Sequence, residues 1–262
     1  MIIIGERLNS TRKPIREALE RRLGDFLTSE AIRQKEAGAE YIDLNAAALM
    51  EEEVATVTWA VPLLQGATSL SLAIDSPNPE AIEAGLKAHR GRALLNSLTA
   101  ERSRIERILP LIREYKPRVI VLCLDDEGMP KDPDSAVAIA RKMVELLARE
   151  GLSMDDIFID PLVRPVAAEP GAARLFLDSL AALKKALPGA ITVAGLSNVS
   201  FGLPLRGLIN RSLLVMALER GLDAAICDPL DKDLQASLKA AEALLVRDPS
   251  MKNFLRFARD RK

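Results

Sequence analysis

Residues 119–150, VIVLCLDDEGMPKDPDSAVAIARKMVELLARE, contain one copy of a unit that recurs along the whole chain. The unit begins with a continuous apolar run, Val119 to Leu124, which is typical of a strand buried on both faces. In residues 134–150, apolar and charged side chains alternate at helical spacing on opposite faces. We expect Asp134 or Ser135 to cap the start of this helix and Gly151 to end it.

Seven other apolar runs have the same character, at Ile2 to Ile4, Tyr41 to Leu44, Leu70 to Ile74, Ala93 to Leu95, Ile157 to Ile159, Ile191 to Leu196 and Ala224 to Cys227. Helical patterns are predicted at 28–38, 51–64, 79–89, 101–115, 171–186, 210–220 and 232–246. Eight strand–helix units in a chain of this length predict an α/β fold of the (β/α)8 TIM barrel type. The prediction is a single domain over residues 1–262 with an extra C-terminal helix at about 248–259. A doubly wound open sheet is the alternative.

Composition restricts the class of protein. The chain has 262 residues, of which 48% are hydrophobic and 28% charged, and its net charge is -1. This balance does not favour a nucleic-acid or membrane-surface partner. No apolar stretch is long enough to span a membrane, and MIIIGERLNS lacks a basic leader, so we expect a cytoplasmic protein. Cys123 and Cys227 lie in apolar runs and are expected to be buried, reduced thiols.

Polar side chains follow or end each apolar run. They are Glu6, Asp43, Asn45, Asp75, Asn96, Ser97, Asp125, Asp126, Asp160, Ser197, Asn198 and Asp228. In a barrel all these strand ends face one mouth, where active sites are built. A single aspartate at a strand end is commonly a cap or a turn residue, which is the interpretation we favour for Asp125, Asp126 and Asp228. The whole ring predicts a pocket rich in hydrogen-bond acceptors.

Several chemistries do not fit this pocket. The chain has no glycine-rich phosphate loop, and its only histidine, His89, ends a helix in KAHRGR. Such a helix end lies on the face opposite the mouth, so His89 is expected to be a surface residue and not a catalytic base. Asp43, Asp75 and Asp160 are metal-ligand types, but they form no ligand-spacing motif, so no metal is expected.

A reduced pterin suits an acidic pocket, because its aminopyrimidinone edge presents N–H donors that one carboxylate can accept together. Further stretches carry a resemblance: IIIGERLN (2–9), YIDLNA (41–46), LAIDS (72–76), AIEAGLKAHRGRALLNS (81–97), PKD (130–132), IFIDPL (157–162), GLSNVSFGLP (195–204), LINRSLL (208–214) and GLDAAICDP (221–229). Through them the whole chain resembles the methyltetrahydrofolate:corrinoid/iron–sulfur protein methyltransferase family and its relatives in corrinoid demethylation systems. The resemblance implies a pterin-binding barrel of the dihydropteroate synthase type.

The resemblance also implies residue roles. Asp75, Asn96 and Asp160 would hold the pterin ring, and Gly195 and Ser197 would line the pocket. As the catalytic residue, Asn198 would hydrogen-bond N5, the nitrogen that bears the methyl group, and Arg206 would lie near the folate.

The implied reaction is SN2 methyl transfer between N5 of tetrahydrofolate and the cobalt of a corrinoid. Because this chain has no DxHxxG motif and no room for a cobalamin domain, the corrinoid would arrive on a separate protein. A homodimer with an open mouth is expected, with no nucleic-acid or membrane partner.

Two stretches depart from the family pattern. Phe201-Gly202 stands where the acetogen enzymes have more polar residues, and Ala46 to Ala48 follows DLN. One alternative is another pterin-binding barrel enzyme such as a dihydropteroate synthase, although its NxTPDSF-type loop and basic phosphate-binding residues are not seen. The other is a non-catalytic module that binds folate or a corrinoid protein.

Overall fold

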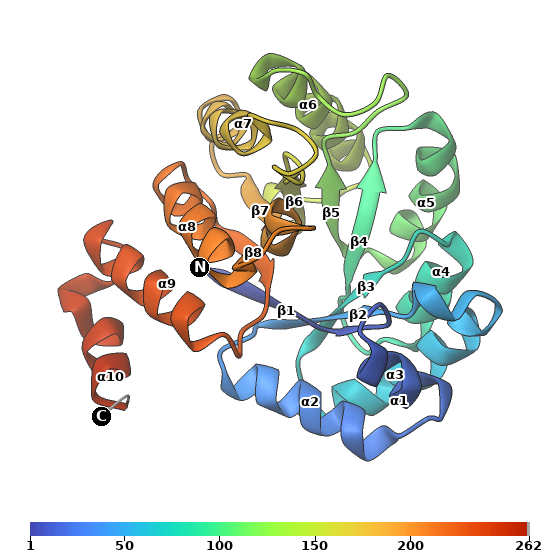
Figure 1. The fold of residues 1–262 in the computed structure, drawn as a ribbon. Helices are drawn as coiled ribbons and strands as arrows, with labels where there is room; N and C mark the ends of the chain where they lie inside the picture. The colour runs from blue at the N-terminus through green and yellow to red at the C-terminus, as the bar shows by residue number, and fades with distance from the viewer. Residues whose placement is uncertain (261–262) are drawn as a thin grey trace.

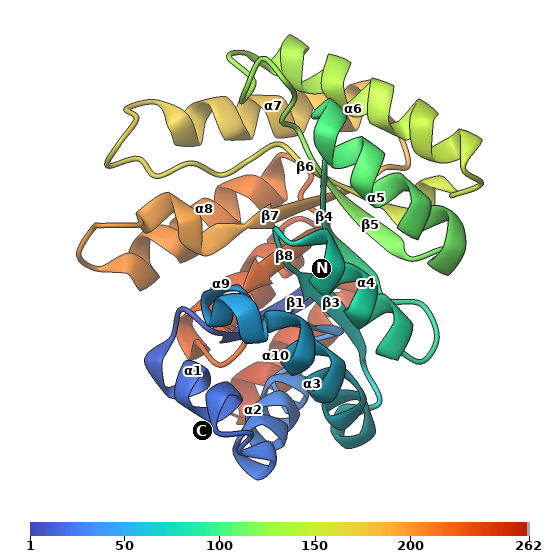
Figure 2. The same cartoon turned by 90° about the vertical axis from the view of Figure 1, so that its right-hand side faces the viewer.

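The structure is a computed structural model that describes residues 1–260. Within these residues, eight parallel strands close into a barrel in chain order, surrounded by helices (Figures 1 and 2). The strands are β1 (Ile2–Asn9), β2 (Tyr41–Asn45), β3 (Ser71–Asp75), β4 (Leu94–Thr99), β5 (Arg118–Leu122), β6 (Ile157–Asp160), β7 (Ile191–Gly195) and β8 (Ala224–Cys227). Pairing of β1 with β8 closes the ring, so the predicted barrel is confirmed and the open sheet is excluded.

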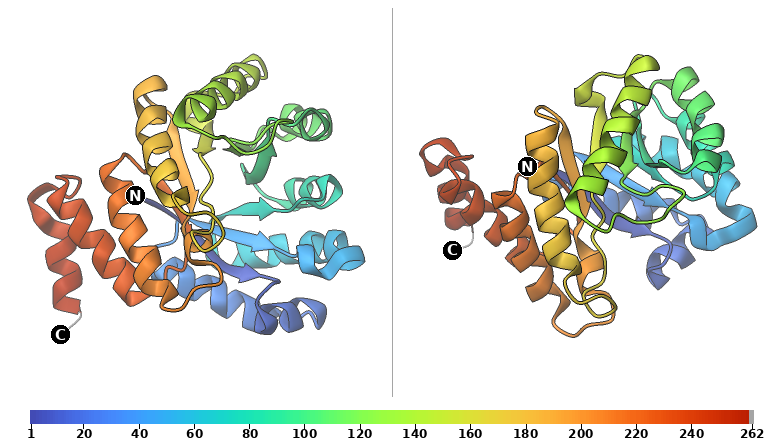
Figure 3. Two further views of the ribbon diagram at one scale, coloured as in Figure 1. Left: turned by 45° about the horizontal axis from the view of Figure 1, so that its top comes forward. Right: turned by 90° about the horizontal axis from the view of Figure 1, so that it is seen from above.

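The helices alternate with the strands around the outside of the barrel (Figure 3). They are α1 (Lys13–Glu20), α2 (Gly24–Glu36), α3 (Glu53–Thr68), α4 (Pro79–Ala88), α5 (Arg102–Tyr115), α6 (Pro133–Arg149), α7 (Ala172–Ala186), α8 (Arg206–Glu219), α9 (Lys232–Leu244) and α10 (Lys252–Asp260). Short 3-10 turns are η1 (Ala47–Glu52), η2 (Met154–Asp156), η3 (Leu196–Ser200) and η4 (Pro249–Met251). The sequence did not predict α1, and it placed the start of α8 four residues too late.

The predicted cap of α6 was wrong. Its N-cap is Asp132, whose carboxylate accepts the N–H of Ser135 at 2.7 Å, while Ser135 Oγ accepts the Asp132 backbone N–H at 3.3 Å. The reciprocal capping box starts the helix two residues earlier than expected. Gly151, with φ of 85°, follows the helix end as expected.

Two apolar cores hold the barrel together. The larger one lies between the strands and the helices, and the smaller one fills the inside of the barrel. The inner core takes one buried side chain from each strand: Ile4, Tyr41, Ala73, Leu94, Ile120, Phe158, Val193 and Ala224. Tyr41 and Phe158 meet edge to face, with ring centroids 6.3 Å apart. This packed layer closes the barrel interior and makes a floor beneath the mouth.

Two strands extend more than one residue past their predicted ends. β1 continues to Asn9 and β4 to Thr99, because pairing resumes after a register shift with Leu8 opposite Leu44 and Leu98 opposite Val121. Glu6 and Asn96 therefore lie within strands and have the fixed direction of strand side chains.

His89 is buried, so the prediction that it is a surface residue was wrong. Its Nε2 lies 3.0 Å from both the backbone N–H of Leu72 and the amide nitrogen of Gln65, and its Nδ1 is 3.3 Å from the Gly91 carbonyl. Burial lowers the pKa of this imidazole, which keeps it neutral. Leu72 lies near the start of β3, so His89 is on the face opposite the mouth, as expected.

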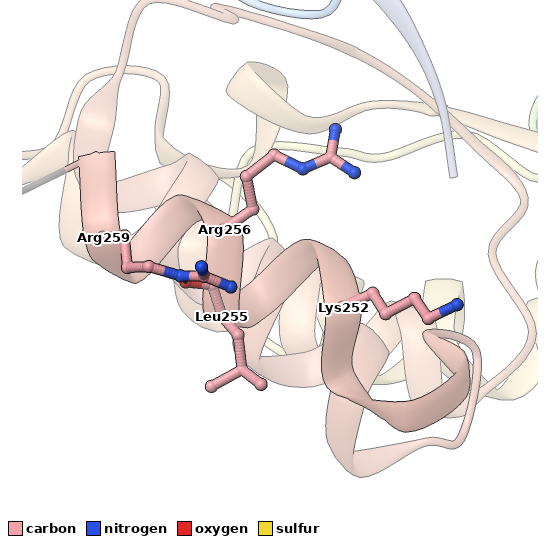
Figure 4. Close-up of a pocket in the computed structure, with 4 residues that line it drawn as sticks. All are labelled: Lys252, Leu255, Arg256 and Arg259. Carbon is pink, nitrogen blue, oxygen red and sulfur yellow. The ribbon is translucent and has the colours of Figure 1, made fainter.

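The C-terminal segment continues beyond the barrel helices. The η4 turn leads into α10, which lies beside α9 on the outside of the barrel (Figure 1). One face of α10 presents Lys252, Leu255, Arg256 and Arg259 around a hollow of about 350 Å³ (Figure 4). Over residues 1–260, every helix is too short or too polar to cross a bilayer.

Candidate active site in the barrel mouth

The site is the next inward-facing layer above the apolar floor. Side chains alternate between the two faces of a strand, so the residue two positions after each floor residue also points inward. The eight positions reached in this way are the polar Glu6, Asp43, Asp75, Asn96 and Asp160, then Gly195, and the apolar Leu122 and Ile226. Along five of the strands, the inward-facing residues therefore change from apolar to polar over two residues. Three of the predicted pterin-binding residues, Asp75, Asn96 and Asp160, lie in this layer.

Asp43 and Asp75 form the most acidic part of this layer. Asp43 Oδ1 accepts the Asn96 amide at 3.0 Å, and Asp75 Oδ2 accepts the Asn45 amide at 2.9 Å. The two carboxyls also hydrogen-bond each other. Burial, followed by the negative charge of Asp75, raises the pKa of Asp43 well above its usual range, and burial raises that of Asp75 to about 6. Burial and mutual repulsion therefore both oppose the ionisation of the two carboxyls together.

Asp160 lies on the other side of the mouth. Its Oδ1 accepts the Leu162 N–H at 2.7 Å, and the Gly195 N–H also supports the carboxyl. Burial outweighs these two donors and raises the pKa of Asp160 to about 7. A ligand that offers N–H donors would favour the ionised form of this carboxyl.

The turn after β7 brings Ser197 and Asn198 to the mouth. Ser197 Oγ donates to Glu6 Oε2 at 3.0 Å, which joins this turn to β1. Burial raises the pKa of Glu6 in spite of that hydrogen bond. Asn198 is exposed. A Cβ atom at Gly195 would lie only 3.2 Å from Asn198 Nδ2, so the glycine leaves the space in which the amide sits.

Arg206 holds this turn in place. Its Nη2 donates to the Ser197 carbonyl at 2.8 Å and its Nε to Ser200 Oγ at 3.0 Å, while Ser200 Oγ donates to Asn210 at 2.7 Å. The predicted folate contact of Arg206 stays a prediction, and the structure adds a role in fixing the backbone beside Asn198.

Sequence reasoning missed Arg104. Its guanidinium donates to the carbonyls of Ser76 (2.9 Å), Pro77 (2.6 Å) and Ser97 (2.8 Å), so α5 ties together the ends of β3 and β4. Its charge also lowers the pKa of Asp75, after the larger effects of burial and the Asn45 hydrogen bond. Nothing in the local sequence marked this arginine.

Glu6, Asp43 and Asn45 were noted as strand-end polar residues but were not assigned to the folate site. The two-residue spacing from the inner core could have placed Glu6 and Asp43 in the layer, with Asn45 one step further along β2.

Other acidic residues of the predicted ring have structural partners. Asp125 accepts the Glu127 N–H at 2.9 Å, and Asp126 accepts the Arg102 N–H at 3.2 Å. Asp228 pairs with Arg7 at 2.7 Å and accepts the Leu230 N–H at 2.9 Å. The turn and cap interpretation of these three residues is therefore confirmed. In the described part of the chain, no three His, Cys, Asp or Glu side chains group as metal ligands would.

Similarity to known proteins agrees with this geometry. A curated relative, the methylcorrinoid:tetrahydrofolate methyltransferase of Eubacterium limosum, is 33% identical over 250 residues, covering 95% of this chain and 92% of that one. The methionine synthase of Mycobacterium tuberculosis is 29% identical over 239 residues, which cover 86% of this chain and 20% of that longer protein.

Solved structures of dihydropteroate synthases share the fold. The Yersinia pestis enzyme, solved with a pterine–sulfa conjugate, has a TM-score of 0.72 at 19% identity and covers 94% of this chain and 93% of its own. The Xanthomonas albilineans enzyme in complex with 7,8-dihydropteroate has a TM-score of 0.66 at 19% identity, with 95% and 93% covered. Pterin binding enzymes as a family match residues 5–228, and this chain belongs to that family.

Proposed function

We propose that this chain transfers a methyl group between N5 of tetrahydrofolate and the cobalt of a corrinoid carried by a separate protein. The observation that carries the proposal is the polar inward layer, which lies on an apolar floor and ends at the exposed amide of Asn198. The name and full-length similarity of the Eubacterium limosum relative support the same reaction.

The inward layer supplies the groups that would bind the pterin. Asp160, once ionised, accepts two N–H donors from the aminopyrimidinone edge, and Asn96 and Asp75 contribute polar contacts from the neighbouring strands. Gly195 and Ser197 border the same space. The apolar floor carries no hydrogen-bonding group other than the Tyr41 hydroxyl, which is taken by Arg118 at 2.6 Å. The ring is thus oriented by its polar edge, which leaves N5 toward the open side.

In the direction from folate to corrinoid, N5 is protonated first, because a neutral tertiary amine is a poor leaving group. The Co(I) lone pair then forms the bond to the methyl carbon, the carbon–nitrogen pair stays on N5, and N5 keeps the proton as an N–H. In the reverse direction the N5 lone pair takes the methyl carbon, the cobalt–carbon pair remains on cobalt, and N5 releases its proton to water.

Asn198 would serve both protonation states of N5, because its amide has both a donor and an acceptor. Its stabilisation of the charged nitrogen grows as charge develops, so it lowers the barrier rather than only binding the substrate. The rest of the layer contributes positioning, by holding the methyl group in line with cobalt.

A direct assay tests the proposal. Purified protein is mixed anaerobically with 5-methyltetrahydrofolate and cob(I)alamin, and the loss of the Co(I) spectrum is followed. We expect catalysed conversion that depends on both substrates. Folate binding without conversion would instead support a binding module, and condensation of a pterin pyrophosphate with 4-aminobenzoate would support a dihydropteroate synthase.

We also propose that the chain acts as a cytoplasmic homodimer whose mouth stays open. The dimer is expected from the family resemblance. The mouth must stay open because a corrinoid is too large to enter a sealed pocket. The two cysteines of the chain, Cys123 and Cys227, are buried and form no disulfide, which is compatible with a reducing compartment. Light scattering at micromolar concentration checks the dimer, and a monomer mass would contradict it.

A further inference from the structure

We propose that the loop after β7 provides the surface on which the corrin ring rests during methyl transfer. The surface is residues 201–208, named here the β7 apolar loop. Its Phe201 and Leu205 side chains are 67% and 75% exposed, and Leu208 is also exposed. The inference rests on the proposed function and assigns the contact region of the corrinoid.

The position of these exposed side chains in the fold supports the proposal. The loop begins three residues after Asn198, at the mouth, where βα loops meet the substrate. It contains one charged residue, Arg206, whose guanidinium is engaged by Ser197 and Ser200. The loop therefore offers apolar contacts to whatever approaches Asn198.

Leu205 adds an independent observation. It is the N-cap residue of α8, and its φ of 54° lies in the left-handed region. The Cβ of a leucine makes that region unfavourable, and glycine or asparagine would adopt it more easily. An exposed leucine there stabilises neither the backbone nor the core, so its side chain is explained by a contact made outside this chain.

The loop is held rigidly. Leu203 donates its N–H to the Ser200 carbonyl at 3.0 Å, and Val166 from the β6 loop donates to the Val199 carbonyl at 3.1 Å. Together with the Arg206 hydrogen bonds, these contacts anchor the backbone that carries the apolar side chains. A preorganised apolar surface binds with a smaller loss of conformational entropy than a mobile one.

The corrin ring is the occupant that fits this place. Cobalt must come within bond-forming distance of a methyl group on N5, so the surrounding macrocycle must lie over the mouth and rest on its loops. Methyl groups cover much of the macrocycle and suit exposed Phe and Leu side chains. A second copy of this chain seated on the same loop would obstruct the mouth during transfer.

The experiment measures the KM for free cob(I)alamin at saturating 5-methyltetrahydrofolate, using Phe201→Ser and Leu205→Gly. Losing a partly buried Phe or Leu contact is expected to raise this KM by about five- to tenfold. Folate affinity, measured by titration, should stay unchanged. Leu205→Gly should leave Tm equal to or above that of the wild type, because it relieves the left-handed backbone. A purely structural role would lower Tm instead.

Matched controls lie on the C-terminal elements. Leu244 at the end of α9 is 81% exposed and Leu255 on α10 is 49% exposed (Figure 4), and serine at either position should leave the cobalamin KM unchanged. A KM within twofold of wild type in both loop variants would overturn the inference, as would a dimer that dissociates in those variants without a change in KM. A wild-type protein that transfers no methyl group would instead refute the proposed function.

Discussion

Asn198 is the residue on which the proposed chemistry depends most. Its side chain is exposed at the mouth, while Asp43 and Asp160 are buried and Asp75 is half-buried. The buried carboxyls are suited to hold a ring, and the amide above them is suited to follow a change of charge at N5. Binding and catalysis are thereby divided between different residues of one site.

Asn198→Ala should therefore lower the single-turnover rate of methyl transfer more than it weakens folate binding. Lost donors of this kind cost about 10²–10³ in rate in other enzymes, and we expect the lower end because water reaches the open mouth. Rapid-mixing rates at saturating folate, with folate titration and Tm measured alongside, check this. A lower Tm with a normal rate would mean that Asn198 only shapes the turn.

Asp160 gives the site a pH dependence. Its pKa in the folded protein is about 7, raised from 3.8, so the native state binds more protons than the unfolded state between those values. The contribution to stability is present below the lower value and is lost as pH rises through about 7. Folate binding favours the ionised form, so affinity should rise about tenfold between pH 6 and pH 8.

Asp160→Asn provides the comparison for that pH dependence. The apo variant should be more stable than the wild type at pH 8, have a flatter Tm profile between pH 4 and pH 8, and bind folate weakly at every pH. Calorimetry and folate titration across this range measure both effects. If the variant kept the pH profile of the wild type, Asp160 would not be the source of the pH dependence.

At the scale of elements, the corner between β7 and η3 is the critical junction. Gly195 has φ of -77°, which alanine adopts without strain, but the added Cβ would meet the Asn198 amide at 3.2 Å. Gly195→Ala should therefore keep Tm near that of the wild type while it displaces the amide and slows methyl transfer. Thermal melts and transfer rates decide this, and an unaltered rate would show that the close approach is irrelevant to the reaction.

The sequence predicted the strands of the barrel well, because continuous apolar runs between helical patterns leave few alternatives. It missed α1, whose eight residues give only about two turns of periodicity. It also ended β1 and β4 too early, because Glu6 and Asn96 look like strand ends when their inward direction in the barrel is unknown. The roles of Arg104 and Arg206 follow from backbone carbonyls of distant segments, which no local pattern reveals.

At the scale of the molecule, the barrel converts eight strand ends into one site. The apolar layer inside the barrel gives a floor, the polar layer above it gives hydrogen bonds, and the loops give the outer rim. Helices on the outside contribute mainly to the larger core, with α5 and α8 sending Arg104 and Arg206 to the mouth. In the proposed reaction, the polar layer binds the pterin above the apolar floor, and the outer loops contact the corrinoid.

The most direct measurement follows the methyl group itself. Tetrahydrofolate, methylcobalamin with a deuterated methyl group and the purified protein are incubated anaerobically, and the folate is analysed by mass spectrometry. We expect the wild type to produce tetrahydrofolate carrying the intact labelled methyl group, and Asp75→Ala to form much less at the same folate concentration. If the folate stays unlabelled after prolonged incubation with folded wild-type protein, the proposed methyl transfer is wrong.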